Sequence, residues 1–204
     1  DLGSSNGYPA VMGGAEGTGL YAAFPHAYVV YAKYCDGSSF TGNVSEPVPV
    51  TVNASYSTRI FYRGRRVLDA LFDELFRSRG LDGATELLLA GCSAGALTTY
   101  VHADYVSSLV SNRGAKGAKV VALADAMFSL HHDASPNVSS NYYTRQFTWG
   151  FDAWDSAASV NQACVVAHAS QPWVCFHGAV VAPFVSTPLF VANAVHDTWQ
   201  ANGV

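Results

Sequence analysis

The feature that most constrains the fold is a short glycine-framed turn, Gly91–Gly95 (GCSAG), between two different kinds of segment. Before it, Glu86–Ala90 (ELLLA) is almost wholly apolar, as in a strand at the centre of a parallel sheet. After it, the segment from Ala94 to about Val110 repeats an apolar or aromatic residue at every fourth position, as helices do: Leu97, Val101, Tyr105 and Leu109. A strand, a G-x-S-x-G turn and a helix in this order predict a nucleophile elbow, in which the serine stands above a sheet.

The elbow assigns a role to each of its residues. A Cβ atom at Gly91 or Gly95 is expected to collide with the neighbouring strand or helix, so both glycines leave room for the turn. Ser93 is the candidate nucleophile, and the backbone N–H of Ala94, at the start of the helix, is a candidate donor to an oxyanion. The alternative is a turn of small residues in which Ser93 only caps the helix. The strand before and the helix after the turn favour the nucleophile.

Other segments continue the alternation of strands and helices. Ala27–Tyr34 and Lys119–Leu123 are predicted as buried strands, and Pro188–Ala194 as a third after the elbow strand and helix. Apolar spacing between Tyr62 and Phe76 predicts a helix that ends near Gly80. This alternation predicts an α/β layer fold with a mainly parallel central sheet.

The remaining segments are less regular. Residues 41–56 carry Pro, Thr, Asn and Ser and are predicted as a surface loop. Residues 126–187 are expected to form a cap or insertion over the sheet edge. A chain of 204 residues fits one domain, so residues 1–204 are interpreted as a single domain. Because the chain begins without Met and stops soon after a strand-like run, we expect this domain to be incomplete at both ends.

A hydrolase triad places its acid and then its histidine after the serine. Asp197 follows the last strand-like run and is the candidate acid, with a turn or helix N-cap as the alternative. No histidine follows Asp197, and the adjacent His196 would point to the opposite face of an extended chain. We therefore expect the triad histidine outside this chain. All seven histidines are interpreted as surface or packing residues: His26, His102, His131, His132, His168, His177 and His196.

Composition excludes several other classes of function. Eleven basic and 15 acidic residues give a net charge of −4, with no basic stripe for nucleic acid. Apolar runs are short, so no membrane span is predicted. His131 and His132 lack a Cys or carboxylate at metal-ligand spacing, so neither a metal nor a cofactor is expected.

Cysteines and sequons favour a secreted protein over a cytosolic one with four reduced thiols. Asn-x-Ser triplets occur at Asn43, Asn53 and Asn137. A disulfide is predicted between Cys164 and Cys175, which are 11 residues apart in an irregular segment. Two other cysteines are expected to differ in their surroundings: Cys35 pairs with a cysteine outside the chain, and Cys92 is a buried free thiol.

Several motifs together resemble the pectin acetylesterase family, whose animal relative is the carboxylesterase Notum. Tyr34–Gly42 (YCDGSSFTG) is similar to the plant enzymes' YCDGSSFTGD, and Leu89–Gly95 (LAGCSAG) to their SGCSAGG. Further resemblances are ADAMF at Ala124–Phe128, TPLF at Thr187–Phe190 and DTWQ at Asp197–Gln200. The motifs stand in the family's order and cover most of the chain.

The resemblance implies an α/β-hydrolase-like three-layer fold with a mainly parallel central sheet, and an extracellular serine esterase without a metal. Ser93 would be the nucleophile, Asp197 the triad acid and Ala94 an oxyanion donor. The family's histidine lies downstream of the matching DTWQ, and its other oxyanion donors come from a Gly-Gly-Gly-Trp segment upstream. Departures occur at Ala96 and Met127, where the family has Gly, and in the elbow helix, where a family Cys is absent.

The sequence thus predicts an enzyme that deacetylates an acetylated polysaccharide such as pectin through a Ser93 acyl-enzyme. Two alternatives stay open: an inactive carbohydrate- or lipid-binding module on the same fold, and a Notum-like esterase for a longer acyl chain. Asp36, Ser38 and Ser39 are interpreted as a structural turn near the pocket. Three tryptophans are expected to pack within the cap, with contact to sugar or acyl groups as the alternative: Trp149, Trp154 and Trp173.

Overall fold

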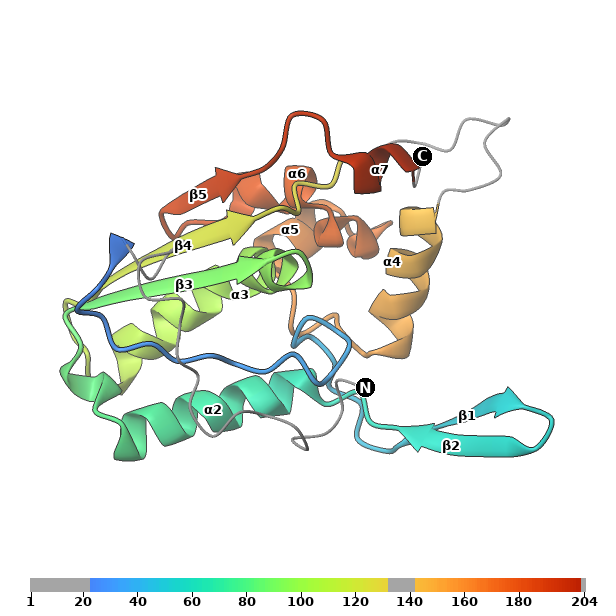
Figure 1. Ribbon diagram of the computed structural model, residues 1–204, viewed down its shortest axis with the longest axis horizontal. Helices are drawn as coiled ribbons and strands as arrows, with labels where there is room; N and C mark the ends of the chain where they lie inside the picture. The colour runs from blue at the N-terminus through green and yellow to red at the C-terminus, as the bar shows by residue number, and fades with distance from the viewer. Residues whose placement is uncertain (1–22, 132–141, 203–204) are drawn as a thin grey trace. The chain divides into compact units, whose positions relative to one another are not determined.

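The computed structural model of the chain describes residues 23–131 and 142–202 (Figure 1). The chain forms two compact units, Asp1–Cys35 and Asp36–Val204. In the described part of the first unit, residues 28–35 have no regular secondary structure, and Tyr28, Val29, Val30 and Tyr31 are exposed. The predicted buried strand at Ala27–Tyr34 is therefore wrong. An apolar run forms a stable strand only where a partner strand and a core are available to it.

The second unit is built on a parallel sheet of β3 (Glu86–Cys92), β4 (Lys119–Asp125) and β5 (Leu189–Ala192), in that order. All three strands point the same way in Figure 1, so their carboxyl ends share one edge. At that edge Cys92 pairs with Asp125, and Asp125 with Ala192. The three strand predictions in this unit are confirmed, with ends shifted by up to two residues.

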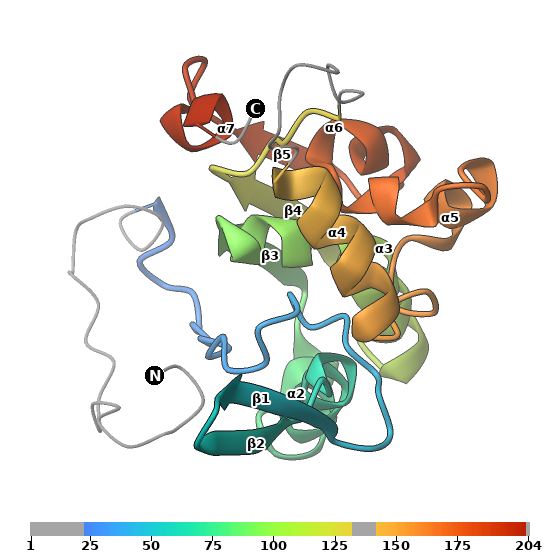
Figure 2. The same cartoon turned by 90° about the vertical axis from the view of Figure 1, so that its right-hand side faces the viewer.

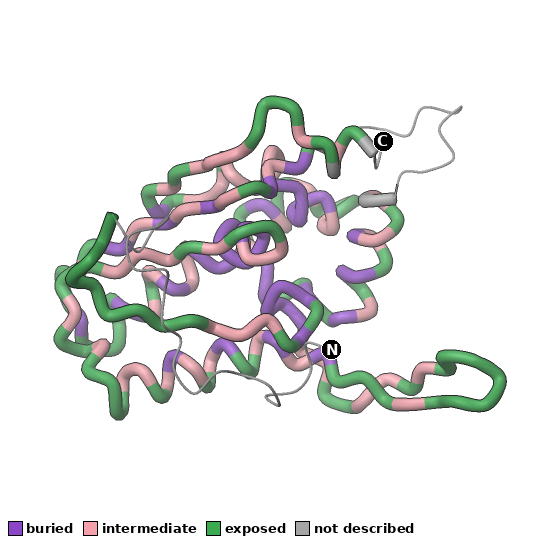
Figure 3. The backbone as a smooth tube through the Cα atoms, in the orientation of Figure 1, coloured by how far each residue is buried: buried purple, intermediate pink, exposed green. Residues whose placement is uncertain are grey.

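One face of the sheet carries the core. Val120, Ala122 and Ala124 alternate with half-buried residues along β4, and α3 (Ala94–Arg113) packs against both β3 and β4 (Figures 2 and 3). The first half of α3 is buried on every side from Ala96 to Ala103. β3 is only half-buried, because within the described residues it pairs on one edge alone. The result is the expected α/β arrangement of a parallel sheet flanked by helices.

Between the start of the second unit and β3, the chain forms a hairpin and a helix. β1 (Val48–Asn53) and β2 (Tyr56–Ile60) pair antiparallel where residues 41–56 were predicted as a loop. The tight turn is set by Asn53, whose Oδ1 accepts from the Ser55 N–H at 2.9 Å. The predicted helix is confirmed as α2 (Gly64–Ser78), with Leu68 and Phe72 buried. Of the three sequons, Asn53 is exposed, Asn43 is half-buried, and Asn137 lies outside the described residues.

Short helices fill the region between β4 and β5. They are α4 (Tyr142–Ala153), α5 (Gln162–Ala167), α6 (Gly178–Val181) and the 3₁₀ turns η2 (Pro172–Phe176) and η3 (Ala182–Phe184). Two further short helical elements lie outside this region: η1 (Leu81–Gly83) after α2, and α7 (Thr198–Asn202) after β5. An aromatic cluster joins α4 to η2 through ring contacts of Phe147, Phe151 and Trp154 with Phe176.

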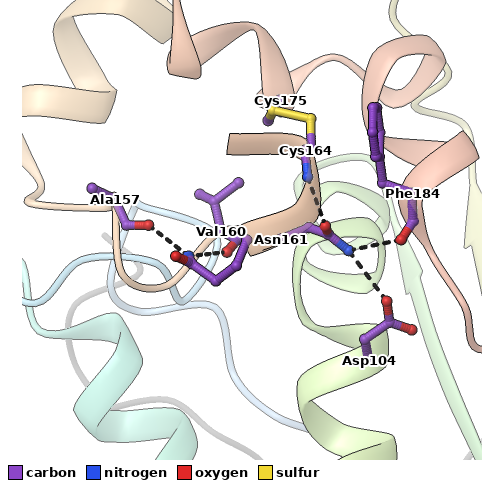
Figure 4. The surroundings of a disulfide bond; sticks show 8 residues. Asp104, Ala157, Val160, Asn161, Cys164, Cys175 and Phe184 are labelled. Atoms are coloured by element: carbon purple, nitrogen blue, oxygen red, sulfur yellow. Dashed lines mark hydrogen bonds between the residues drawn. A yellow bond between two sulfur atoms is a disulfide. The ribbon is translucent and has the colours of Figure 1, made fainter. Parts of the chain in front are cut away.

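A disulfide joins Cys164 to Cys175 and confirms the predicted pairing. Asn161 caps α5 beside it: Oδ1 accepts from the Cys164 N–H at 3.1 Å, and Nδ2 donates to Asp104 and to the Phe184 carbonyl, each at 3.2 Å (Figure 4). Closing a loop of this size stabilises a fold by about 3 kcal/mol. The disulfide and its cap therefore hold the irregular segment against α3.

Asp104 extends this connection to β5. Its carboxylate accepts from the Ser186 N–H at 3.0 Å, from the Thr187 N–H at 2.7 Å and from the Thr187 hydroxyl at 2.8 Å. Each of these is a charge-assisted hydrogen bond. Asp104 thereby fixes the start of β5 against the helix that begins at the elbow.

Candidate active site

Ser93 occupies the turn between β3 and α3 in a strained conformation. Its φ is 56° and its ψ is −119°, values that non-glycine residues rarely adopt. The Ser93 N–H donates to the Asp125 carbonyl at 2.8 Å, so β4 holds the turn in place. The residue is exposed. This is the geometry that a nucleophile elbow requires.

The two glycines of the elbow play different parts. A Cβ atom on Gly91 would lie 2.2 Å from the Gly95 oxygen and 2.3 Å from its carbonyl carbon, so the expected collision is confirmed there. A Cβ atom on Gly95 would meet nothing within 4 Å, and the prediction for that residue is wrong. The backbone of Gly95, including its α-carbon, lies close to Gly91, whereas a Cβ atom added to Gly95 would point into open space.

The start of α3 is held from two sides. The Ser93 carbonyl accepts from the N–H groups of Ala96 at 2.8 Å and Leu97 at 3.2 Å. The Ala94 carbonyl accepts from the hydroxyls of Ser39 at 3.1 Å and Thr98 at 3.0 Å. The N–H groups of the first helical residues have no acceptor inside a helix, and the helix dipole makes that end positive. Ala94 can therefore present its N–H to an oxyanion formed beside Ser93.

Ser39 belongs to a buried turn that begins at Asp36. The Asp36 Oδ2 atom accepts from the Ser38 hydroxyl, from the Ser38 N–H at 3.1 Å and from the Phe40 N–H at 2.9 Å. Ser39 and Phe40 have positive φ angles of 49° and 56°. The prediction of a structural turn is confirmed. The sequence analysis missed the contact of Ser39 with Ala94, because 55 residues separate the two.

Asp197 lies between β5 and α7 and is half-buried. Oδ1 accepts from the Gln200 N–H at 3.2 Å, and Oδ2 from the Gln200 side-chain amide at 3.2 Å. The N-cap alternative thus describes its local structure. A carboxylate has about four acceptor sites, so capping a helix and accepting from a histidine are compatible roles for one aspartate. Ser93 follows β3 and Asp197 follows β5, which brings both to the carboxyl edge of one parallel sheet, where α/β folds build their sites.

The described histidines are divided between packing and exposed positions. His102 and His177 are buried, and His177 stacks on the half-buried His131 with ring centroids 5.2 Å apart. His168 is half-buried, His26 and His196 are exposed, and His132 lies outside the described residues. The triad histidine beyond this chain stays a prediction.

His102 is expected to make the protein less stable in mild acid. Full burial, together with the nearby Arg65 cation, lowers the pKa of His102 from 6.5 to about 4, against the opposing influence of backbone at Phe40 and Ser39. Between pH 6.5 and about pH 4, His102 is protonated in the unfolded chain and neutral in the folded chain, so the free energy of unfolding falls as the pH falls. One such group costs about 3 kcal/mol across that window. Urea unfolding at pH 7 and pH 4 is expected to show this loss in the wild type and to lack it in His102→Gln. An equal loss in both proteins would contradict the assignment.

Cys92 is exposed and free, so the prediction of a buried thiol is wrong. Alternation along β3 places it on the face opposite α3, next to its pairing partner Asp125. Partial burial of the sulfur and the Asp125 carboxylate raise the pKa of the Cys92 thiol, which disfavours the nucleophilic thiolate. Cys35 is also exposed and free, and its pairing outside the chain stays a prediction.

Aromatic residues of the short-helix region differ in exposure. Trp154 is buried, and Trp173 is half-buried. Trp149 is 57% exposed and lines an open surface depression, although Tyr62 and Trp154 contact its ring. The depression is lined by residues of α4: Thr144, Arg145, Thr148, Trp149, Asp152 and Ala153. Neither Ser93 nor Asp197 is among them.

Two further observations concern residues 23–131 and 142–202. Within these ranges no three His, Cys, Asp or Glu side chains gather as a metal-ligand set. Of the helices described there, none combines the length and the apolar character needed to cross a membrane.

Comparison with known sequences identifies the family. Residues 22–204 match the protein family described as Pectinacetylesterase. The chain belongs to the pectinacetylesterase family. Pectin acetylesterase 11 of Arabidopsis thaliana is 32% identical over 198 residues, which cover 97% of this chain and 46% of the plant protein. Palmitoleoyl-protein carboxylesterase notum1a of Danio rerio is 27% identical over 197 residues, covering 90% of this chain and 37% of the fish protein.

A solved structure of the same family shares the fold. The Wnt deacylase Notum from Drosophila matches with a TM-score of 0.67 and 26% sequence identity, over 83% of this chain and 47% of that chain. The chain therefore spans less than half the length of each of these relatives. The resemblance read from the motifs and the α/β-hydrolase-like fold expected from it are both confirmed.

Proposed function

We propose that the protein is a secreted serine carboxylic-ester hydrolase that removes acetyl groups from an acetylated polysaccharide such as pectin. The observation that carries this proposal is the elbow. Ser93 is exposed on a strained turn at the positive end of a buried helix, a conformation that costs about 1 to 3 kcal/mol and persists where function needs it. Membership of the pectinacetylesterase family and the 32% identity to a plant pectin acetylesterase support the reaction and the acetyl group.

The proposed reaction runs through an acyl-enzyme. A histidine from outside this chain takes the Ser93 proton as Oγ attacks the ester carbonyl carbon, and Asp197 orients that histidine. The N–H of Ala94 stabilises the tetrahedral oxyanion. The C–O bond to the sugar then breaks, and the histidine returns the proton to the leaving hydroxyl. Water attacks the acyl-enzyme in the same way, releasing acetate and restoring Ser93.

The likeness to Notum supports a second candidate, hydrolysis of a longer acyl chain. The relatives named for this activity are a palmitoleoyl-protein carboxylesterase at 27% identity and a Wnt deacylase at 26%. The two candidates share the nucleophile and the acyl-enzyme. They differ in the length of the acyl chain that the site must receive and in the molecule that carries the ester.

Relative rates on a series of esters distinguish these candidates. We expect the complete gene product to release acetate from acetylated pectin, and to hydrolyse para-nitrophenyl acetate at least about tenfold faster than the octanoate, measured as kcat/KM. A preference for octanoate or palmitate would favour the Notum-like activity. Binding of acetylated pectin without turnover of any ester would favour the inactive binding module.

A further inference from the structure

Two side-chain amides tie the segment after β4 to the segment after β5. The Asn193 Oδ1 atom accepts from the Phe128 N–H at 3.0 Å. Gln200 makes two bonds to the same segment: Oε1 accepts from the Leu130 N–H at 3.0 Å, and Nε2 donates to the Phe128 carbonyl at 3.1 Å. Both segments leave the carboxyl edge of the sheet, the edge on which Ser93 lies.

These bonds fix which way the Gln200 amide points. A backbone N–H only donates and a backbone carbonyl only accepts, so Leu130 requires the amide oxygen and Phe128 requires the amide nitrogen. The nitrogen is then the atom that faces Asp197, and it donates to Oδ2 at 3.2 Å. The backbone N–H of Gln200 donates to Oδ1 at 3.2 Å. One residue therefore holds both oxygens of the Asp197 carboxylate.

We infer that Gln200 is a positioning residue for the ester hydrolysis, acting through Asp197. The inference rests on the role of triad acid proposed above for that aspartate. With both oxygens held, the carboxylate keeps one orientation, which sets the direction from which the histidine can donate to it. Asn193 also bonds to the segment after β4, but its side chain bonds to Phe128 and Ala194 and not to Asp197. A variant of Asn193 therefore tests the anchoring of that segment, whereas a variant of Gln200 also tests the orientation of the Asp197 carboxylate.

Gln200→Glu and Asn193→Asp form a matched pair of nearly isosteric variants. Each keeps the oxygen that accepts from the Leu130 or Phe128 N–H and replaces the amide nitrogen with a second oxygen. In Gln200→Glu that oxygen faces Asp197 Oδ2 and the Phe128 carbonyl, whereas in Asn193→Asp it faces the Ala194 carbonyl. In the complete gene product, we expect Gln200→Glu to lower kcat for para-nitrophenyl acetate about 10- to 100-fold, with KM changed less than about twofold. For Asn193→Asp, kcat is expected to stay within about twofold of the wild type.

A double-mutant cycle separates positioning from general damage to the fold. Because Gln200 acts through Asp197, Gln200→Glu is expected to add less than about a twofold loss of kcat to Asp197→Ala. Thermal unfolding and circular dichroism of each variant exclude partial unfolding as the cause.

Three outcomes would overturn the inference: an unchanged kcat in Gln200→Glu, an equal loss in Asn193→Asp, or a full additional loss in the Asp197→Ala background. The failure of the proposed function is distinct. If Asp197→Ala itself keeps the wild-type kcat, the triad assignment falls and the role of Gln200 falls with it.

Discussion

Ser93→Ala is expected to lower kcat/KM for ester hydrolysis by about four orders of magnitude or more. The variant removes the oxygen that we propose is acylated, while the Ala94 N–H and the fold around the elbow are expected to remain. The strained φ of 56° is retained in such a variant, because it is imposed by the bond from the Ser93 N–H to the Asp125 carbonyl and by the close passage of Gly95 over Gly91. Steady-state hydrolysis of para-nitrophenyl acetate by the complete gene product measures the loss, and circular dichroism checks the fold.

Cys92→Ala is the matched control, since Cys92 is the adjacent residue, is exposed and carries a chemically competent thiol. Its raised thiol pKa and its place on β3 outside the strained turn argue against a catalytic role. We expect Cys92→Ala to keep kcat/KM within about threefold of the wild type. Loss of activity in Cys92→Ala together with activity in Ser93→Ala would make the thiol the nucleophile.

Gly91→Ala is expected to destabilise the fold by about 3 kcal/mol or more and to abolish hydrolysis. The added Cβ would lie 2.2 Å from the Gly95 oxygen, and relief requires the first turn of α3 to move away from β3. That turn is buried from Ala96 onward and is held at Ala94 by Ser39, so a shift breaks several contacts together. Urea unfolding measures the free energy, and para-nitrophenyl acetate hydrolysis measures the activity.

Gly95→Ala is the control that shows whether damage in Gly91→Ala comes from crowding at position 91 or from losing any glycine of the motif. It adds the same methyl group four residues later in the same motif, where nothing lies within 4 Å and α3 has already begun. Alanine is favoured over glycine in a helix by about 1 kcal/mol, so stability equal to or above the wild type is expected. If Gly95→Ala were as damaging as Gly91→Ala, the strand-to-helix contact would not be the reason for the glycine at 91.

Local sequence was sufficient for the elements that carry their own pattern. The elbow, the helix from Gly64 and the strand at Lys119 each combine a periodicity with a turn or cap signal, so their existence could be predicted from short windows. The predicted strand at Ala27–Tyr34 shows the limit of this reasoning. Its β-branched residues indicate strand preference, but pairing depends on distant partners that no window contains.

The same limit applies to the candidate site. Ser93, Ala94 and Asp197 could be proposed from the sequence, because a motif and a strand end mark them there. The contact of Ser39 with Ala94 and the bond of Asn193 to Phe128 were missed, since each joins segments at least 55 residues apart. Gln200 had a local signal, because Asp and Gln three residues apart have the spacing of a capping box. Its bonds to Phe128 and Leu130 are long-range and emerge only in the fold.

The proposed function requires that Ser93 becomes acylated. This acylation can be detected by mixing the complete gene product with para-nitrophenyl acetate, quenching in acid within the burst phase, and sequencing the peptide that contains Gly91–Gly95 by tandem mass spectrometry. We predict an acetyl group on Ser93 in the wild type and none in Ser93→Ala. An acetyl group on Cys92, or steady turnover with no adduct on this peptide, would contradict the account.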